Sequence, residues 1–294
     1  MPDAPATLHV TNGDAAAEPL RRAVPGGEVL PWRDVLHEGP VPAGLAPAEL
    51  DRVRARFLAG GRATPDEVLA DLEARDAALA AAAGGGEVVL WFEHDLYDQL
   101  QLLQVLDRLG DGDTAGARVS LVCIGEFPGV EPFHGLGQLT AEQLASLYPG
   151  RAPVTAGQRA LARAAWAAFR APDPTELERV LAGDTGALPF LRGALLRHLE
   201  QFPAVGDGLA RTERQVLEAV AAGAATPGEI FVADQAREER VFMGDTTLWG
   251  YVAGLAAGPE PLLRAADGAP FRLPEPGGDL AAFREQRLIE QHAR

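Results

Sequence analysis

The chain has 294 residues, of which 42 are acidic and 26 basic, giving a formal net charge of −16. Every basic residue is an arginine. The absence of lysine excludes a P-loop lysine, a Schiff-base lysine and therefore pyridoxal-phosphate chemistry. A single cysteine, Cys123, excludes an internal disulfide and a zinc site built on cysteines. No apolar run has membrane-spanning length and the N-terminus lacks a signal-peptide pattern, so we expect a cytoplasmic protein with no membrane partner.

Strand and helix signals alternate through residues 1–138. Apolar runs of strand length cover residues 7–11, 28–32, 87–92 and 118–124, and helical patterns follow at 15–23, 46–58, after 64 and from 96 to 106. Parallel neighbours need crossover connections, so this alternation predicts an α/β domain with a mostly parallel sheet and Rossmann-like layers of helices. In such sheets, ligands bind at the carboxyl ends of the strands.

Residues 139–208 carry helical patterns alone. We expect helices at 141–148, 156–170, 175–181 and 188–202. Thr140 with Gln143 and Thr155 with Gln158 have the spacing of a capping residue and its partner three positions later, as Thr64 has with Glu67. This segment therefore reads as a helical scaffold.

Residues 209–273 have the order of elements expected of a winged-helix-like module. Helical patterns at 212–222, 227–240 and 246–257 precede a candidate hairpin at 262–273 around Asp267-Gly268, and a helical tail is expected at 274–294. The module has six arginines against nine acidic residues, a net charge of −3. DNA-binding modules cluster basic groups against phosphates, so this charge argues against nucleic acid and leaves a protein partner through 209–273.

Three segments dense in reactive side chains follow predicted strands: residues 11–14, 32–40 and 91–99. If the sheet is parallel, all three leave it at the same edge and converge there. A fourth loop, after residue 124, adds Glu126 and His134. The sequence thus predicts a polar site at the C-terminal edge of the sheet.

The candidate residues fall into two groups. The candidate catalytic residues are the imidazoles and carboxylates of these loops: His37, Glu38, Glu93, His94, Asp95 and Asp98. Seven neighbours are candidates for holding substrate: Asn12, Asp14, Trp32, Arg33, Asp34, Tyr97 and Gln99. Among the first group, His94 is the leading general base or metal ligand.

Carboxylates crowded into one cleft repel one another unless a cation or a proton is shared among them. A divalent metal would relieve the repulsion and activate a water, with His37, His94, Glu93 and Asp98 as candidate ligands. A cationic substrate such as an amine or a guanidine would relieve it as well, and a His-carboxylate pair can act in acid-base catalysis without metal. No His-Glu-x-x-His motif is present, and the Gly-x-Gly at 135–137 lacks the context of a dinucleotide fingerprint.

Structural roles compete with these functional ones. Asn12-Gly13-Asp14 has the composition of a turn that caps the first helix, and Asp95 with Asp98 fits a helix cap and its partner. Neither role accounts for the Glu-His pair at 93–94 or the His-Glu pair at 37–38. His9, inside an apolar run, is expected to be a core histidine.

At these residues the sequence resembles DUF1835, a bacterial family of domains of unknown function. The resemblance rests on the segments at 9–14, 32–40 and 91–100, together with 211–215 and 244–249 near the C-terminus. It covers most of the chain and implies the family's domain layout. It implies no established activity and no catalytic residues.

We expect an enzyme of hydrolase or lyase type, acting on a small polar or cationic molecule by either metal-assisted or metal-free acid-base catalysis. The alternative is a non-catalytic sensor or adaptor that binds a small molecule at the sheet edge and signals through the winged-helix-like module. A third reading, a structural or assembly protein with a satisfied polar network, has less weight because buried ionisable networks are costly.

Overall fold

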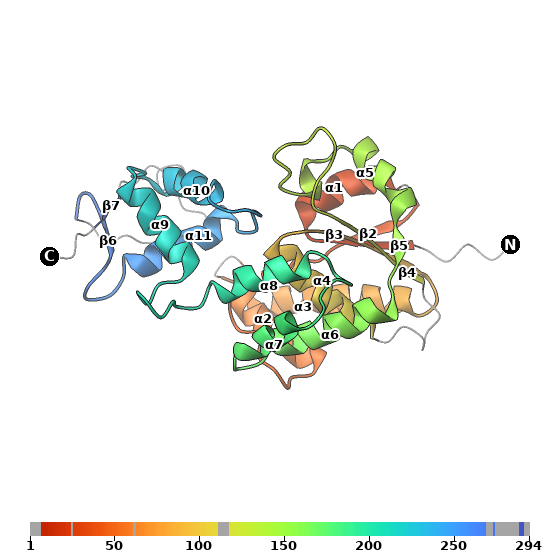
Figure 1. The fold of residues 1–294 in the computed structure, drawn as a ribbon. Helices are drawn as coiled ribbons and strands as arrows, with labels where there is room; N and C mark the ends of the chain where they lie inside the picture. The colour runs from red at the N-terminus through yellow and green to blue at the C-terminus, as the bar shows by residue number, and fades with distance from the viewer. Residues whose placement is uncertain are drawn as a thin grey trace. The chain divides into compact units, whose positions relative to one another are not determined.

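A computed structural model describes residues 7–24, 26–60, 63–110, 118–268, 273 and 288–290. The chain divides into two compact units, residues 1–196 and 197–294 (Figure 1). No helix in the described ranges combines the length and the hydropathy needed to cross a membrane.

The first unit is built on a five-stranded, mostly parallel sheet, as predicted. Its strands are β1 (Thr7–Thr11), β2 (Glu28–Pro31), β3 (Glu87–Glu93), β4 (Arg118–Ile124) and β5 (Ala152–Pro153), in the order β2-β1-β3-β4-β5. The first four are parallel, and the short β5 is antiparallel to β4. The chain leaves β1 for β2 on one side and returns to β3 on the other. The gap between β1 and β3 is therefore a topological switch point, where α/β sheets bind ligands.

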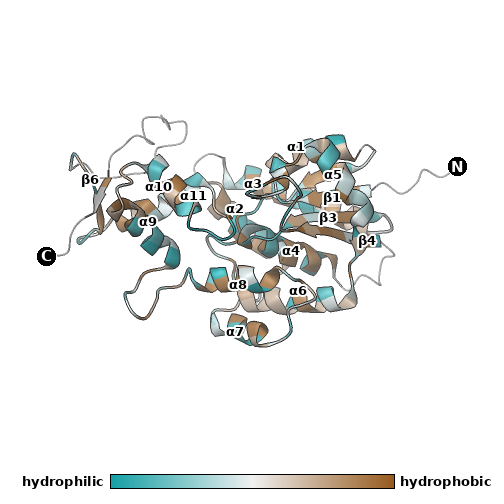
Figure 2. Cartoon of the chain, turned by 45° about the horizontal axis from the view of Figure 1, so that its top comes forward, coloured by the Kyte–Doolittle hydropathy of each residue, from teal (hydrophilic) through white to brown (hydrophobic). Residues whose placement is uncertain are grey.

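Helices cover both faces of this sheet (Figure 1). α1 (Asp14–Ala23) and α5 (Ala141–Leu147) lie on one face; α3 (Pro65–Ala83), α4 (Leu96–Leu109) and α6 (Ala156–Phe169) lie on the other. Because both faces are covered, β3 is a continuous apolar run, and Figure 2 shows its apolar colour together with that of β1. α2 (Pro47–Leu58), α7 (Thr175–Ala182) and most of α8 (Leu191–Leu199) complete the unit.

The predicted caps and the predicted core histidine are confirmed. The hydroxyls of Thr64, Thr140 and Thr155 each accept the backbone N–H three residues later. His9 is buried, and its Nδ1 accepts a hydrogen bond from the Trp91 indole at 3.1 Å. By contrast, β5 has no counterpart among the sequence predictions.

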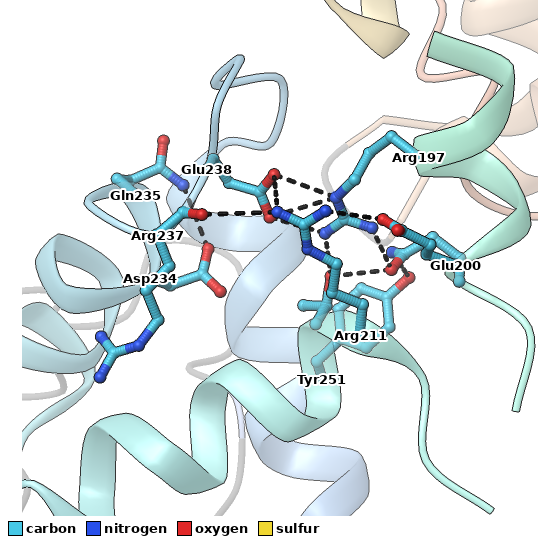
Figure 3. Close-up of polar contacts among 10 residues, drawn as sticks. Arg197, Glu200, Arg211, Asp234, Gln235, Arg237, Glu238 and Tyr251 are labelled. Atoms are coloured by element: carbon cyan, nitrogen blue, oxygen red, sulfur yellow. Dashed lines mark hydrogen bonds and ion pairs between the residues drawn. The ribbon is translucent and has the colours of Figure 1, made fainter. Parts of the chain in front are cut away.

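The second unit contains α9 (Arg211–Ala221), α10 (Pro227–Gln235) and α11 (Asp245–Leu255). A network of arginines and carboxylates joins its parts: Arg197 donates to Glu238 at 2.7 Å and Arg211 to Glu200 at 2.7 Å (Figure 3). The helix expected at 227–240 ends five residues early, at Gln235.

The strands of the second unit pair differently from the expected hairpin. β6 (Leu263–Ala265) is antiparallel to β7 (Leu288–Glu290), which lies within the segment expected to form a helical tail. The turn at 267–268 is described, but the expected return strand falls mainly outside the described residues, as does the rest of the tail.

Candidate functional site

The loops after β1 and β3 meet at the carboxyl edge of the sheet. Asn12, directly after β1, donates from its side-chain Nδ2 to Glu93 Oε1 at 3.0 Å and to Asp98 Oδ2 at 2.8 Å. The side chain of Asn12 is thus engaged across the switch point rather than in capping α1, whose N-cap residue is Gly13. These contacts join Asn12 to two carboxylates that follow it in the sequence by 81 and 86 residues.

Three carboxylates form the centre of the site: Glu93, Asp95 and Asp98. Glu93 ends β3, Asp95 is the N-cap of α4, and Asp98 lies in its first turn. They are 3%, 4% and 0% exposed, and each offers a carboxylate oxygen within 4.8 Å of the others. Among the described residues, this is the group of side chains placed to share a metal ion.

Local backbone chemistry explains how these acids are held. Asp95 Oδ1 accepts the N–H of Asp98 at 3.0 Å, which is the predicted cap, and Asp98 Oδ1 accepts the N–H of Glu93 at 2.8 Å. Gln99 Nε2 donates to the carbonyl of Glu93 at 2.6 Å. The capping role and the clustering of the acids therefore coexist, because one oxygen of each aspartate is occupied by a backbone N–H.

The loop after β4 closes over Glu93. The N–H of Leu136 donates to Glu93 Oε1, and Gly135, at φ +149°, lies so close that a Cβ there would be 2.2 Å from Glu93 Oε2. Burial, followed by the charge of Asp95, raises the pKa of Glu93 to about 8, against the hydrogen bonds from Leu136 and Asn12. Burial and the charges of Glu93 and Asp95 raise the pKa of Asp98 well above its usual value.

The donor set suits a hard divalent cation. Three carboxylates offer oxygen ligands alone, which favours Mg²⁺, Mn²⁺ or Ca²⁺ over zinc. Neither predicted histidine ligand belongs to the group. The His94 ring contacts Phe133 and Phe190, with centroids 5.9 and 6.0 Å away, and the His37 ring lies edge-on to Tyr97 at 5.9 Å.

The loop after β2 contributes buried supports as well as edge groups. Asp34 is 1% exposed and forms an ion pair with the fully buried Arg54 at 2.7 Å. The Trp32 indole donates to Gln104 Oε1 at 2.7 Å. Arg33 instead forms an exposed pair with Asp14 at 2.7 Å. Of these four predicted substrate-binding residues, two are therefore fixed in the core and two lie at the surface.

The remaining predicted residues surround this centre. The Tyr97 hydroxyl donates to the carbonyl of Asn12 at 3.1 Å, and burial raises its pKa. Glu38 is half-buried and its carbonyl accepts from Arg54 at 2.7 Å. Glu126 and His134, proposed for the fourth loop, are exposed.

Sequence reasoning missed three supporting side chains: Arg54, Gln101 and Gln104. The two glutamines are fully buried on α4, and together with Asp98 they recur every three residues in an otherwise leucine-rich helix. That spacing was the available signal. Arg54 had none, because an arginine on an amphipathic helix is ordinarily solvent-exposed.

Comparison with known proteins found neither a family model nor a curated protein that matches this chain.

Proposed function

We propose that the first unit is a metal-assisted enzyme of hydrolase or lyase type, acting on a small polar or cationic molecule at the sheet edge. One observation carries the proposal: the carboxylates of Glu93, Asp95 and Asp98 are buried within 4.8 Å of one another at the switch point between β1 and β3. Burying three like charges costs free energy, and a bound cation would offset that cost. The cluster therefore favours a metal-binding role.

The roles of the chain's own residues follow from their placement. Glu93, Asp95 and Asp98 would hold the cation, and Asn12 orients two of these carboxylates through its amide. A bound divalent cation supplies Lewis acidity and lowers the pKa of a bound water. His37 and His94 are both candidates for proton transfer: the His37 ring lies edge-on to Tyr97 with both nitrogens shielded from solvent, and the His94 ring contacts two phenylalanines.

The direct test measures the metal content of protein purified without a chelator or an affinity metal, by elemental mass spectrometry. Titration with Mg²⁺ and Mn²⁺ by calorimetry follows. We expect near-stoichiometric binding in the wild type and in His94→Ala, and loss of binding in Glu93→Gln. This site assignment would be rejected if the wild type bound no metal. It would also be rejected if His94→Ala lost metal binding while Glu93→Gln kept it.

The substrate class is tested separately. A thermal-shift screen with amines, guanidines and neutral polar molecules, each with and without Mn²⁺, should reveal ligands that stabilise the wild type more than His37→Ala. Hydrolysis or elimination of the ligands found is then measured. Full activity in both His37→Ala and His94→Ala would remove histidine from the mechanism.

Membership of DUF1835 is part of the proposal. The segments that carry the resemblance include Asn12 after β1, the loop after β2, and Glu93, Asp95 and Asp98 around the start of α4. If the resemblance is one of descent, the shared feature is this sheet edge. A second protein with the same three segments should then bind Mn²⁺ with the same dependence on its equivalents of Glu93 and Asp98.

A second candidate function is a non-catalytic sensor or adaptor. It is favoured by the second unit, where three helices precede a pair of strands, as in the winged-helix-like module expected over 209–273, although the second strand, β7, lies beyond residue 273. α11 has no basic residue, and its exposed positions are Thr246, Gly250 and Gly254. That surface suits a protein partner better than DNA. Pull-down with and without Mn²⁺ should recover a metal-dependent partner if the second unit signals the state of the first.

A further inference from the structure

The loop after β2, residues 32–40, is held in place by the side chain of a single arginine, Arg54. Arg54 on α2 makes five hydrogen bonds: two to Asp34 Oδ1 at 3.0 and 2.7 Å, and one each to the carbonyls of Val35, Glu38 and Pro40 at 2.8, 2.7 and 3.3 Å. Its side chain is fully buried. A guanidinium has five N–H donors in a fixed planar arrangement, so these bonds define the path of the loop.

The same loop is also fixed from α4. Gln101 Nε2 donates to the carbonyl of Asp34 at 2.8 Å, and Gln104 accepts from the Trp32 indole at 2.7 Å. Asp98 lies on the same helix, one turn before Gln101. The helix that contributes a carboxylate to the site thus also sets the position of the loop.

The loop reaches the site through a short series of contacts. The His37 ring meets Tyr97 at 5.9 Å, the Tyr97 hydroxyl donates to the carbonyl of Asn12 at 3.1 Å, and Asn12 donates to Asp98 at 2.8 Å. The first contact joins the loop after β2 to α4, and the other two join α4 to the residue that follows β1. Displacing residues 32–40 would therefore move His37 relative to the carboxylates.

We propose that Arg54 is a positioning residue that makes residues 32–40 a preformed wall of the site, with His37 at its edge. The buried Arg54–Asp34 pair has no evident use for stability alone, because a well-packed apolar pair in its place is often as stable or more so. Its hydrogen bonds go to loop carbonyls, which an apolar pair cannot fix. The purpose of the wall rests on the proposed function, whereas its dependence on Arg54 does not.

The test is hydrogen exchange by mass spectrometry on the full-length chain. Two variants loosen the loop, Arg54→Met and the milder Gln101→Leu, which leaves the ion pair intact. Arg197→Met is the matched control, because it removes a buried arginine from the second unit (Figure 3). We expect amides of residues 33–39 to exchange at least about tenfold faster in Arg54→Met, less so in Gln101→Leu, and at the wild-type rate in Arg197→Met.

Two further readouts separate positioning from general destabilisation. The His37 imidazole resonance, identified by its loss in His37→Ala, should shift in Arg54→Met and not in Arg197→Met. Mn²⁺ affinity should change less than about threefold in Arg54→Met, because its bonds lie outside the carboxylate cluster. Failure of the wild type to bind Mn²⁺ would remove the proposed function but leave the role of Arg54 to the exchange data.

Unchanged exchange over residues 33–39 in both loosening variants would overturn the proposal. If Arg54→Met does not fold, Gln101→Leu decides the question by the same measurement. Equal acceleration of these amides in Arg197→Met would also overturn it, since the effect would then be global.

Discussion

Glu93→Gln should stabilise the protein in the absence of metal and destabilise it, relative to wild type, in its presence. Glu93 Oε1 accepts from Asn12 and Leu136, and a glutamine carbonyl can take the same position and keep both bonds. The amide nitrogen then occupies the place of Oε2. The substitution therefore removes the charge of Glu93 with little change in shape.

Two estimates give the size of the effect without metal. Unit charges 4.8 Å apart, the limit for oxygens in this cluster, repel by about 3 kcal/mol at an effective dielectric constant of about 20. Separately, the pKa of Glu93 is raised from 4.5 to about 8. Keeping the folded state protonated at about pH 7 then costs about 3 kcal/mol. A raised carboxyl pKa lowers stability as pH rises from 4.5 to 8, so the advantage of Glu93→Gln should shrink towards pH 4.5.

The assay is urea denaturation of both proteins at neutral pH, first with a chelator and then with excess Mn²⁺. Metal at about 1,000 times its dissociation constant adds about 4.1 kcal/mol to the wild type, which exceeds the advantage of Glu93→Gln and should reverse the order of stability. Asp14→Asn is the matched control, because it neutralises an exposed carboxylate near the same sheet edge. It should change stability by less than about 0.5 kcal/mol in either condition.

The reasoning fails if Glu93→Gln is less stable than wild type in the chelator and gains as much from Mn²⁺. The first result would mean that the buried Glu93 carboxyl carries no such cost from burial and from the charge of Asp95, and the second that Glu93 is no ligand.

Three further outcomes are expected. Because Trp91 donates to His9 Nδ1 and burial lowers the pKa of His9 to about 4, stability should fall as pH drops from 6.5 towards 4. Relative to His9→Gln, urea denaturation should show a loss of about 2 kcal/mol at about pH 5. Gly135→Ala should lower the midpoint of thermal unfolding more than Gly129→Ala, since both glycines have positive φ but an added Cβ meets Glu93 at position 135 alone. In a low-salt mobility-shift assay, the protein should not retard duplex DNA.

Much of the fold could be predicted because its signals are local. The strand at 118–124 has the predicted bounds, and the helix starting at Pro65 follows the Thr64 cap as expected. β5 escaped prediction because two residues, Ala152 and Pro153, carry no periodic pattern. It is a strand because it pairs with Leu121 and Ser120 of β4, and this long-range contact leaves no local sequence signal.

The position of the site could be predicted from the sequence more fully than the identity of its candidate metal ligands. Asn12, Glu93 and Asp98 follow strands that the parallel topology brings to one edge, and the structure joins them by hydrogen bonds. The metal role expected of His94 did not follow from its neighbours in sequence. Successive side chains point to opposite sides at the end of a strand, so a residue between two clustered acids is directed away from them.

The supports of the site were hidden for a related reason. Buried amides and carboxylates cost free energy unless every group is paired, so a stripe of Asp98, Gln101 and Gln104 through the core of α4 contradicts local rules for a packed helix. Part of this cost is offset by what these side chains hold: Glu93 and Asn12 at one end and the loop after β2 along the rest. Core packing and site geometry thus share one helix. Changes to this stripe should therefore alter stability and the site together, whereas changes to the exposed Asp14–Arg33 pair should alter neither the core nor the carboxylate cluster.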